Sequence, residues 1–336
     1  MKHALPLSVC VPLFLCAFAL PGGELRFAVP EKTTLAKVFD DTVRFHSTSI
    51  RMRVDGEDVE SPLSAVKVQL LDEVHFELHD VYGAPKDGKP ATLARTFDKL
   101  EGKATQHYEL PEDAPMPAPP DLEHERSSGL EGKTVRFTLG EDGEYKAAFE
   151  GDKGDEELLL KLQEDMDLRA LLPAGAVELD KSWEIDIQAF YSVLNVPGGR
   201  LKLKSKDEPE DNGALGEQLE EHAKGKAKGT YKGQREVDGR KCAVVAIEAE
   251  ATSEGRRDES EKSPAAGVTE IQIEYTVEGE LLWDSEAGHF RSCNLTSKIK
   301  MTMKSSRKVE HDGESHAIER ISEFEGEGEF KCTAGG

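Results

Sequence analysis

The stretch VTEIQIEYTVEGELLWDSEAGHFRSCNLTSKIKMTM, residues 268–303, decides the fold. Its apolar side chains fall at odd-numbered positions in two runs. The first run is Ile271, Ile273, Tyr275 and Val277, and the second is Leu295, Ile299, Met301 and Met303. An alternation of period two is typical of a strand with one buried and one solvated face. Because the DSEAG sequence between the runs (residues 284–288) favours a turn, the stretch predicts an antiparallel hairpin.

Two turns predict one three-stranded sheet. A turn at Asp312-Gly313 sets Leu295 opposite Phe330 on the apolar face, and a slip of one residue would place lysines against such apolar side chains. The DSEAG turn sets Glu274 opposite Lys298 on the solvated face. Cross-strand charge pairs of this kind contribute roughly 0.2–1 kcal/mol each, so both turns favour the same register.

The same alternation recurs at residues 66–70, 74–78 and 135–139, and again from Trp183 to Tyr191. Each of these segments is therefore predicted to be a half-buried strand. Together they predict a mainly β protein.

One segment, DEELLLKLQEDMDLRALL at residues 155–172, breaks the alternation. Its apolar residues recur at helical spacing from Leu158 to Met166, and Asp155 is a suitable N-cap. A second, polar helix is expected at residues 214–223. The predicted fold is a curved antiparallel sheet, an open-barrel-like meander, packed around one main α-helix.

The chain divides by composition into successive regions. Residues 20–110 are expected to form an N-terminal β region. The proline-rich sequence that begins PEDAPMPAPP predicts a linker or crossing loop over residues 111–128, since proline cannot donate to a sheet. Residues 129–336 are expected to form a C-terminal β-meander domain that contains the helix at 155–172.

The N-terminus has the features of an export signal. Lys2 precedes an apolar run from Ala4 to Ala19, and Ala17-Phe18-Ala19 matches a signal-peptidase site. We therefore expect residues 1–19 to be a cleaved signal peptide and the protein to be periplasmic or extracellular. No later stretch is apolar over the length that a transmembrane segment requires.

The formal net charge of −23 limits the classes of partner. An acidic chain is repelled by nucleic acid and by anionic lipid surfaces. We expect no nucleic-acid partner and interpret the charge as a solubilising surface.

Three cysteines follow the predicted signal peptide: Cys242, Cys293 and Cys332. The register of the Asp312-Gly313 turn makes Cys293 and Cys332 cross-strand neighbours, and an exported location permits a disulfide. We predict that these two pair and that Cys242 stays a free thiol. The alternative is three separately buried thiols.

No motif for catalysis or for cofactor binding is present. GxSxG, HExxH, GxxxxGK[ST] and GxGxxG are all absent from the sequence. His75 and His79 share a strand face with Glu77, but they stand ~13 Å apart at strand rise, too far to bind one ion together. The sequence therefore predicts no catalytic residue, no cofactor, no metal site and no enzyme activity.

Three phrases carry a resemblance: LEGKTVRFTLGEDGEY (residues 130–145), DMDLRALLPAGAVELDKSWEID (165–186) and GELLWDSEAGHFRS (279–292). They resemble uncharacterised exported proteins of planctomycete-type bacteria, a family of unknown function. The resemblance implies a secreted β-rich domain and assigns no functional residues. The meander with one crossing helix also looks, more distantly, like the open β-barrels of periplasmic lipoprotein-carrier proteins.

These observations favour an exported, non-enzymatic binding or scaffold protein. Its partner would be a protein, an envelope polymer or an apolar ligand. One alternative is a periplasmic carrier of a lipid or other apolar ligand, which requires an apolar cavity between sheet and helix. The other is a hydrolase with a carboxylate-based site, which requires convergent carboxyl groups with perturbed pKa values in a cleft.

Overall fold

The computed structural model describes residues 25–111, 117–151, 154–195, 198–199, 201–205, 214–259, 267–311 and 314–335. The predicted signal peptide (residues 1–19) and the Asp312-Gly313 turn lie outside the described residues. Within the described part of the chain, no helix has the length and the apolar character needed to cross a membrane.

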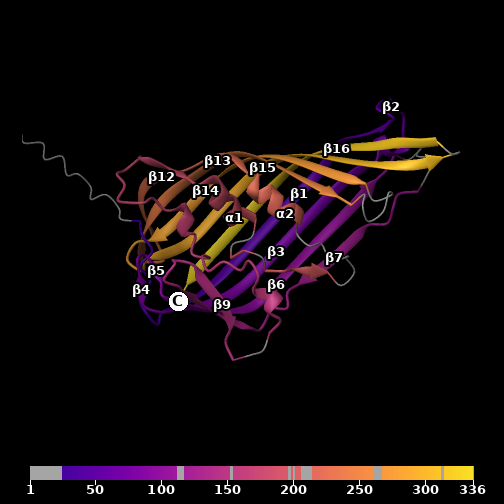
Figure 1. Ribbon diagram of the computed structural model, residues 1–336. Coiled ribbons are helices and arrows are strands. Elements are labelled where there is room, and N and C mark those ends of the chain that lie inside the picture. Colours follow the sequence, from indigo (N-terminus) through magenta and orange to yellow (C-terminus); the bar gives the residue numbers. More distant parts are fainter. Residues whose placement is uncertain are drawn as a thin grey trace, which may run out of the picture.

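A single large antiparallel sheet dominates the molecule (Figure 1). Its main path runs β10-β12-β13-β14-β15-β16-β1-β3-β6-β7-β11, with β2 beside β1, β8 beside β6 and β9 beside β8. The long strands are β1 (Thr34–Val54), β3 (Lys67–Tyr82), β6 (Thr92–Glu109), β12 (Lys224–Val237), β13 (Arg240–Asp258), β14 (Val268–Asp284), β15 (His289–His311) and β16 (Glu314–Gly335). The predicted mainly β fold with an open antiparallel sheet is confirmed.

The remaining elements are short. The short strands are β2 (Glu57–Val59), β4 (Pro85–Lys86), β5 (Lys89–Pro90), β7 (Leu122–Ser127), β8 (Thr134–Leu139), β9 (Tyr145–Phe149), β10 (Ser182–Ile185) and β11 (Lys204–Ser205). The helices are α1 (Ile187–Asn195), α2 (Ala214–Glu221) and the 3₁₀ helices η1 (Pro62–Ala65), η2 (Glu156–Leu159) and η3 (Arg169–Leu171). Strands β4 and β5 pair only with each other in the described structure.

The two ends of the chain meet in the middle of the sheet. Strand β1 pairs with β16 over nearly its whole length, for example Phe39 with Cys332. The N-terminal β region and the C-terminal meander therefore share one sheet. Within the range expected to be a linker, residues 122–127 form strand β7, which pairs with β6.

The predicted register of the last hairpin is confirmed, because Leu295 faces Phe330. The register before it is shifted by two residues, so Glu274 faces Lys300 instead of Lys298. The β14–β15 turn closes on Asp284 and His289, and the register shifts again just beyond it. An even shift keeps every side chain on its predicted face, which is why the alternation could not reveal it.

The helix predicted at residues 155–172 is wrong. Asp155 does cap a helical turn by accepting from the Glu157 amide, but the turn is the short η2. The chain then takes a left-handed conformation at Lys161 and again at Leu168. We call residues 155–172 the crossing segment; its polar groups bind the sheet instead of continuing a helix.

The strand predicted from Trp183 to Tyr191 ends early. Only Ser182–Ile185 is a strand, and helix α1 follows at Ile187–Asn195. The Asp186 carboxylate accepts from the Ala189 amide at 2.9 Å and thereby caps α1. Helix α2 confirms the second predicted helix within two residues of its expected end.

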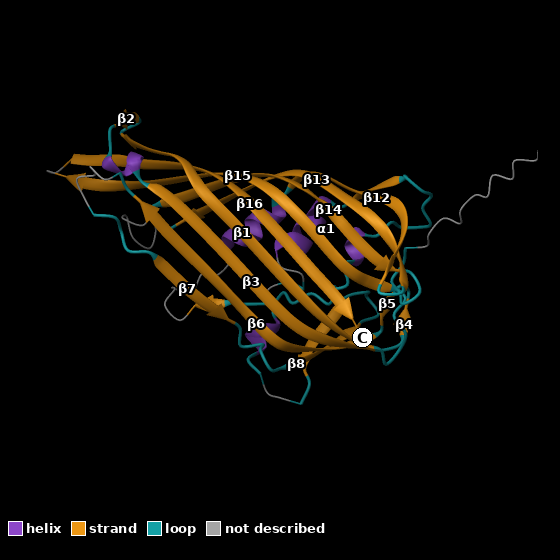
Figure 2. Cartoon of the chain, turned by 180° about the vertical axis from the view of Figure 1, so that it is seen from behind, coloured by secondary structure: helices purple, strands orange, loops and turns teal. Residues whose placement is uncertain are grey.

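Helices α1 and α2 lie on the same face of the sheet, which we call the inner face (Figures 1 and 2). Helix α2 packs on β13 at Gly255, where an added Cβ would stand 2.7 Å from the Leu215 side chain. The main hydrophobic core lies on the inner face, between the sheet, the helices and the crossing segment. The outer face carries the charged residues of the alternation.

Candidate functional site

A cavity of about 1050 Å³ lies between the inner face and the two helices. Its floor is formed by side chains of the central strands, among them Val43, Phe45, Ile299 and Phe330. Its roof is formed by α1 and α2, through Tyr191, Leu194 and Leu219, and by Leu162 of the crossing segment. The lining is predominantly apolar, as in sites that bind apolar small molecules.

Glycines shape the floor. At Gly326 an added Cβ would come within 2.4 Å of the Phe45 ring, so the glycine lets this ring lie against the β16 backbone. At Gly328 an added Cβ would meet the Ser297 hydroxyl and approach the Val43 side chain. The two glycines therefore let the side chains of Phe45 and Ser297 lie against the β16 backbone.

Polar contacts join the two helices of the roof. The Ser192 hydroxyl donates to the Glu220 carboxylate, and the Gln188 amide donates to the Glu221 carbonyl at 3.2 Å. The crossing segment joins the same roof because Lys161 pairs with Glu217 of α2. The roof is therefore one connected layer.

A polar cluster interrupts the apolar floor at one end of the cavity. It consists of Asp41 on β1, Asp72 on β3 and Arg126 on β7, all of which line the cavity. Arg126 donates to the Asp72 carboxylate. Its guanidinium lies over Gly102, where an added Cβ would stand 3.1 Å from two of its nitrogens.

Asp41 differs from its neighbours in having no side-chain partner among the described residues. Burial, and secondarily the negative charge of Asp72, raise the pKa of Asp41 to about 7. On the adjacent strands it faces Val74 and Phe330, which are both apolar. Asp41 is thus a weakly solvated carboxyl group in the wall of an apolar cavity.

Tyr275 is another polar residue that lines the cavity. The residue is 8% exposed, and its hydroxyl is buried with no hydrogen-bond partner among the residues that the structure describes. Its ring packs against the Tyr191 ring at a centroid distance of 5.8 Å. Burial, together with nearby Tyr191, raises the pKa of Tyr275.

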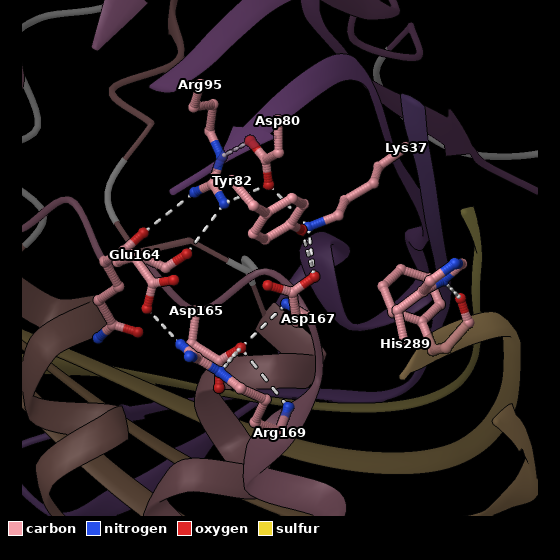
Figure 3. A network of polar contacts seen from close by, with 11 residues as sticks. Lys37, Asp80, Tyr82, Arg95, Glu164, Asp165, Asp167, Arg169 and His289 are labelled. Atoms are coloured by element: carbon pink, nitrogen blue, oxygen red, sulfur yellow. Dashed lines mark hydrogen bonds and ion pairs between the residues drawn. The ribbon is translucent and has the colours of Figure 1, made fainter. Parts of the chain in front are cut away.

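A separate ion network lies deeper in the core (Figure 3). Lys37 Nζ stands 2.7 Å from both the Asp80 and the Asp167 carboxylates, and all three side chains are fully buried. Arg95 donates to both oxygens of Asp80, and the Tyr82 hydroxyl donates to Asp167 at 2.6 Å. Burial alone would raise the pKa of Asp80, but the charges of Arg95 and Lys37 hold it at about 2.

This network anchors the crossing segment to the sheet. Arg95 donates to the carbonyls of Gln163 and Glu164, and Asp167 itself belongs to the segment. The Glu164 carboxylate pairs with Arg169 (Figure 3). Burial raises the pKa of Glu164 to about 7 despite this pair. Because its central side chains have no solvent exposure, the network supports the roof and offers no access to a substrate.

The sequence-predicted cysteine pair is aligned as expected. Cys293 faces Cys332 in the β15–β16 register, and both side chains are buried as thiols. Burial raises the pKa of Cys332. Cys242 is buried elsewhere, in a small cluster with Val244 and Leu282. The disulfide itself stays a prediction.

The outer-face histidines hydrogen-bond to carboxylates. His75 lies 2.7 Å from Asp40 and 3.0 Å from Glu77, and His79 lies 2.9 Å from Asp98. Within the described ranges, no three His, Cys, Asp or Glu residues are grouped so that they could hold a metal ion.

Sequence reasoning missed both the polar cluster and the ion network. A signal was present: Lys37 stands between Leu35 and Phe39, so the alternation assigns it to the buried face. Asp41 follows Phe39 by two residues, so the alternation assigns it to the same face. A charged residue on the apolar parity of a strand indicates a buried polar site.

No protein-family model matches the chain. No curated protein matches it either. The resemblance to a planctomycete-type family is therefore unsupported, although the β-rich domain that it implies agrees with the fold.

Two solved structures show weak similarity. An outer membrane channel from Pseudomonas putida F1 aligns over 92% of this chain and 97% of its own, with 10% identity and a TM-score of 0.23. A Pseudomonas aeruginosa FadL homologue aligns over 94% of this chain and 96% of its own, with 8% identity and a TM-score of 0.23. TM-scores this low carry no argument about fold or function.

Proposed function

We propose that the protein is a non-enzymatic carrier or receptor that binds an apolar ligand in the cavity between the sheet and the helices. The observation that supports this most is the cavity itself, about 1050 Å³ with a mainly apolar lining. Pockets for small molecules commonly measure ~300–1,000 Å³ and bury most of the ligand surface. A molecule with the dimensions of a lipid chain fits such a volume.

The arrangement of the roof supports reversible binding. The floor belongs to long, continuously paired strands, and α1 and the crossing segment bury core side chains, whereas none of residues 215–221 of α2 is fully buried. Short elements with few buried contacts open at a lower free-energy cost than the centre of a sheet. A ligand would therefore enter by displacement of α2 over a rigid floor.

The N-terminal sequence supports a location outside the cytoplasm for this function. Residues 1–19 have the composition of a signal peptide, and the net charge of −23 suits a solvated carrier. We therefore place ligand binding in an extracytoplasmic compartment.

Filling the cavity tests the proposal. Ser297 lies on the cavity floor, and its neighbour Lys298 projects from the opposite face of β15. The probe is 1-N-phenylnaphthylamine, whose fluorescence rises in an apolar environment. We expect S297W to weaken probe binding at least 10-fold and the matched control K298W to leave it within 2-fold. Absence of saturable binding to the unmodified protein, or equal binding to both variants, would overturn the proposal.

A further inference from the structure

The polar cluster on the cavity floor carries an unbalanced charge. Arg126 is already paired with Asp72, while Asp41 has no side-chain partner among the described residues. When both carboxyl groups are ionised, the three side chains sum to one negative charge. Asp41 is half-buried, and the Thr42 backbone amide compensates its charge only in part, so a bound cation would remove the remaining cost.

We infer that the ligand is an amphiphile with a positively charged, hydrogen-bond-donating head, such as a primary ammonium group, and that Asp41 binds this head. The inference rests on the proposed function, because it specifies the head group of the ligand proposed for that cavity. An ammonium group has three donors and no acceptor, which matches a carboxylate with free lone pairs.

The backbone places Asp41 where an apolar chain can accompany the head. In the register of the sheet, Arg126, Gly102, Val74 and Asp41 form one row across four neighbouring strands. Gly102 leaves room for the Arg126 guanidinium, which therefore reaches Asp72 and not Asp41. On its other side Asp41 faces Phe330, so the carboxyl group borders the apolar floor directly.

The rim of the cavity disfavours an anionic head. Its carboxylates outnumber its amines, with Glu217, Glu220 and Glu221 against Lys161 and Lys202. Lys161 is moreover paired with Glu217. An incoming carboxylate or phosphate would meet a negative field at the rim and Asp41 inside, whereas a cation would be attracted by both.

Tyr275 is an independent observation that points to a ligand. Tyr275 lines the same cavity at a distance from Asp41, and its buried hydroxyl has no hydrogen-bond partner among the described residues. Asp41 on β1 faces Phe330 on β16, which faces Leu295 on β15, which in turn faces Gly279 on β14. Tyr275 lies four residues from Gly279 along β14. Strand rise and strand spacing then separate Asp41 from Tyr275 by roughly 20 Å. A ligand with its head at Asp41 can therefore extend an aliphatic chain across the floor toward Tyr275.

The test compares three twelve-carbon probes below their micellar concentrations: dodecylamine, dodecanol and dodecanoate. Each displaces 1-N-phenylnaphthylamine from the full-length protein at pH 7.5. We expect dodecylamine to compete at a concentration at least 10-fold lower than dodecanoate, with dodecanol between them. In D41N this preference should shrink to less than 3-fold, whereas D40N, which changes an exposed neighbour on the outer face, should retain it.

The outcomes separate the two proposals. If no probe binds, the proposed function fails. If all three bind equally, or dodecanoate binds best, the cavity binds apolar molecules but the assignment of a cationic head is overturned. The comparison of probes on the unmodified protein remains decisive even where D41N does not fold. A D41N variant that folds and keeps the full preference would assign the head to another residue and overturn the role of Asp41.

Discussion

Lys37, Asp80 and Arg95 occupy positions that the alternation of their strands assigns to apolar side chains. Each is flanked two residues away by buried apolar residues of the same parity. This pattern identifies them as buried charges from the sequence alone. It does not identify their partners, because Asp167 comes from the crossing segment, far away along the chain. Only the three-dimensional fold brings these charges together.

Removal of the central cation should destabilise the fold strongly. Lys37→Ala leaves the buried Asp80 and Asp167 carboxylates without their shared partner. We expect the free energy of unfolding in urea to fall by ~3–5 kcal/mol. Lys99→Ala is the control, because Lys99 pairs with Glu101 on the exposed surface and should change stability little. Equal effects of the two substitutions would contradict the anchoring role of the network.

Asp41 gives the molecule a pH dependence with a definite sign. Its pKa in the folded protein, about 7, lies above its ordinary value of 3.8, so the folded state binds the proton more tightly. The corresponding stability is fully present below pH 3.8 and is lost as the pH rises to about 7. The difference amounts to at most about 4 kcal/mol. Between pH 5 and pH 8 the free energy of unfolding in urea should decrease less for D41N than for the unmodified protein, whereas E278Q, at an exposed outer-face position, should behave like the unmodified protein.

Cys293 and Cys332 test a register that the sequence predicted. Facing residues in an antiparallel pair have Cα atoms ~4.5–5.5 Å apart, within the range that a disulfide spans. We expect non-reducing peptide mapping of protein exported by its native host to recover these two cysteines in one linked peptide pair. Cys242 serves as the internal control and should be alkylated as a free thiol after unfolding. A disulfide that contains Cys242 would contradict the prediction.

At the scale of elements, tertiary contacts and caps determine the secondary structure of segments whose local sequence pattern fits both a strand and a helix. From Trp183 to Tyr191 the residues satisfy an alternation, yet Ile187, Phe190 and Tyr191 also satisfy helical spacing. Asp186 resolves the ambiguity as an N-cap, and this signal was readable in the sequence. The crossing segment is the opposite case: its helical spacing was genuine, but burial of Asp167 and Glu164 against Lys37 and Arg95 prevents a continuous helix.

The cap of α1 can be tested on stability and binding together. Asp186→Ala removes the acceptor of the Ala189 amide and should lower the free energy of unfolding by about 1 kcal/mol. Because α1 carries Tyr191 and Leu194 of the roof, probe affinity should fall as well. Asp186→Asn keeps a capping oxygen and should restore both quantities. An Ala variant with unchanged stability would show that α1 does not depend on this cap.

At the scale of the whole molecule, local turns were predictable and distant pairings were not. The β15–β16 register followed from one short turn, whereas the β1–β16 pairing joins opposite ends of the chain with no connecting turn to fix it. The cavity belongs to this second class. Its floor needs β1, β14, β15 and β16 side by side, and its roof needs α1, which the alternation concealed.

Ligand binding should stabilise the molecule as a whole, because the cavity is assembled from both ends of the chain and exists only in the folded state. A ligand that binds only the folded protein adds about 2.7 kcal/mol at a concentration 100 times its Kd. We expect dodecylamine at that ratio to raise the midpoint of thermal unfolding followed by circular dichroism. S297W, whose cavity is filled, should show no such shift, while K298W should respond like the unmodified protein. A dodecylamine-induced rise of equal size in S297W would mean that the amphiphile stabilises the fold from some other surface.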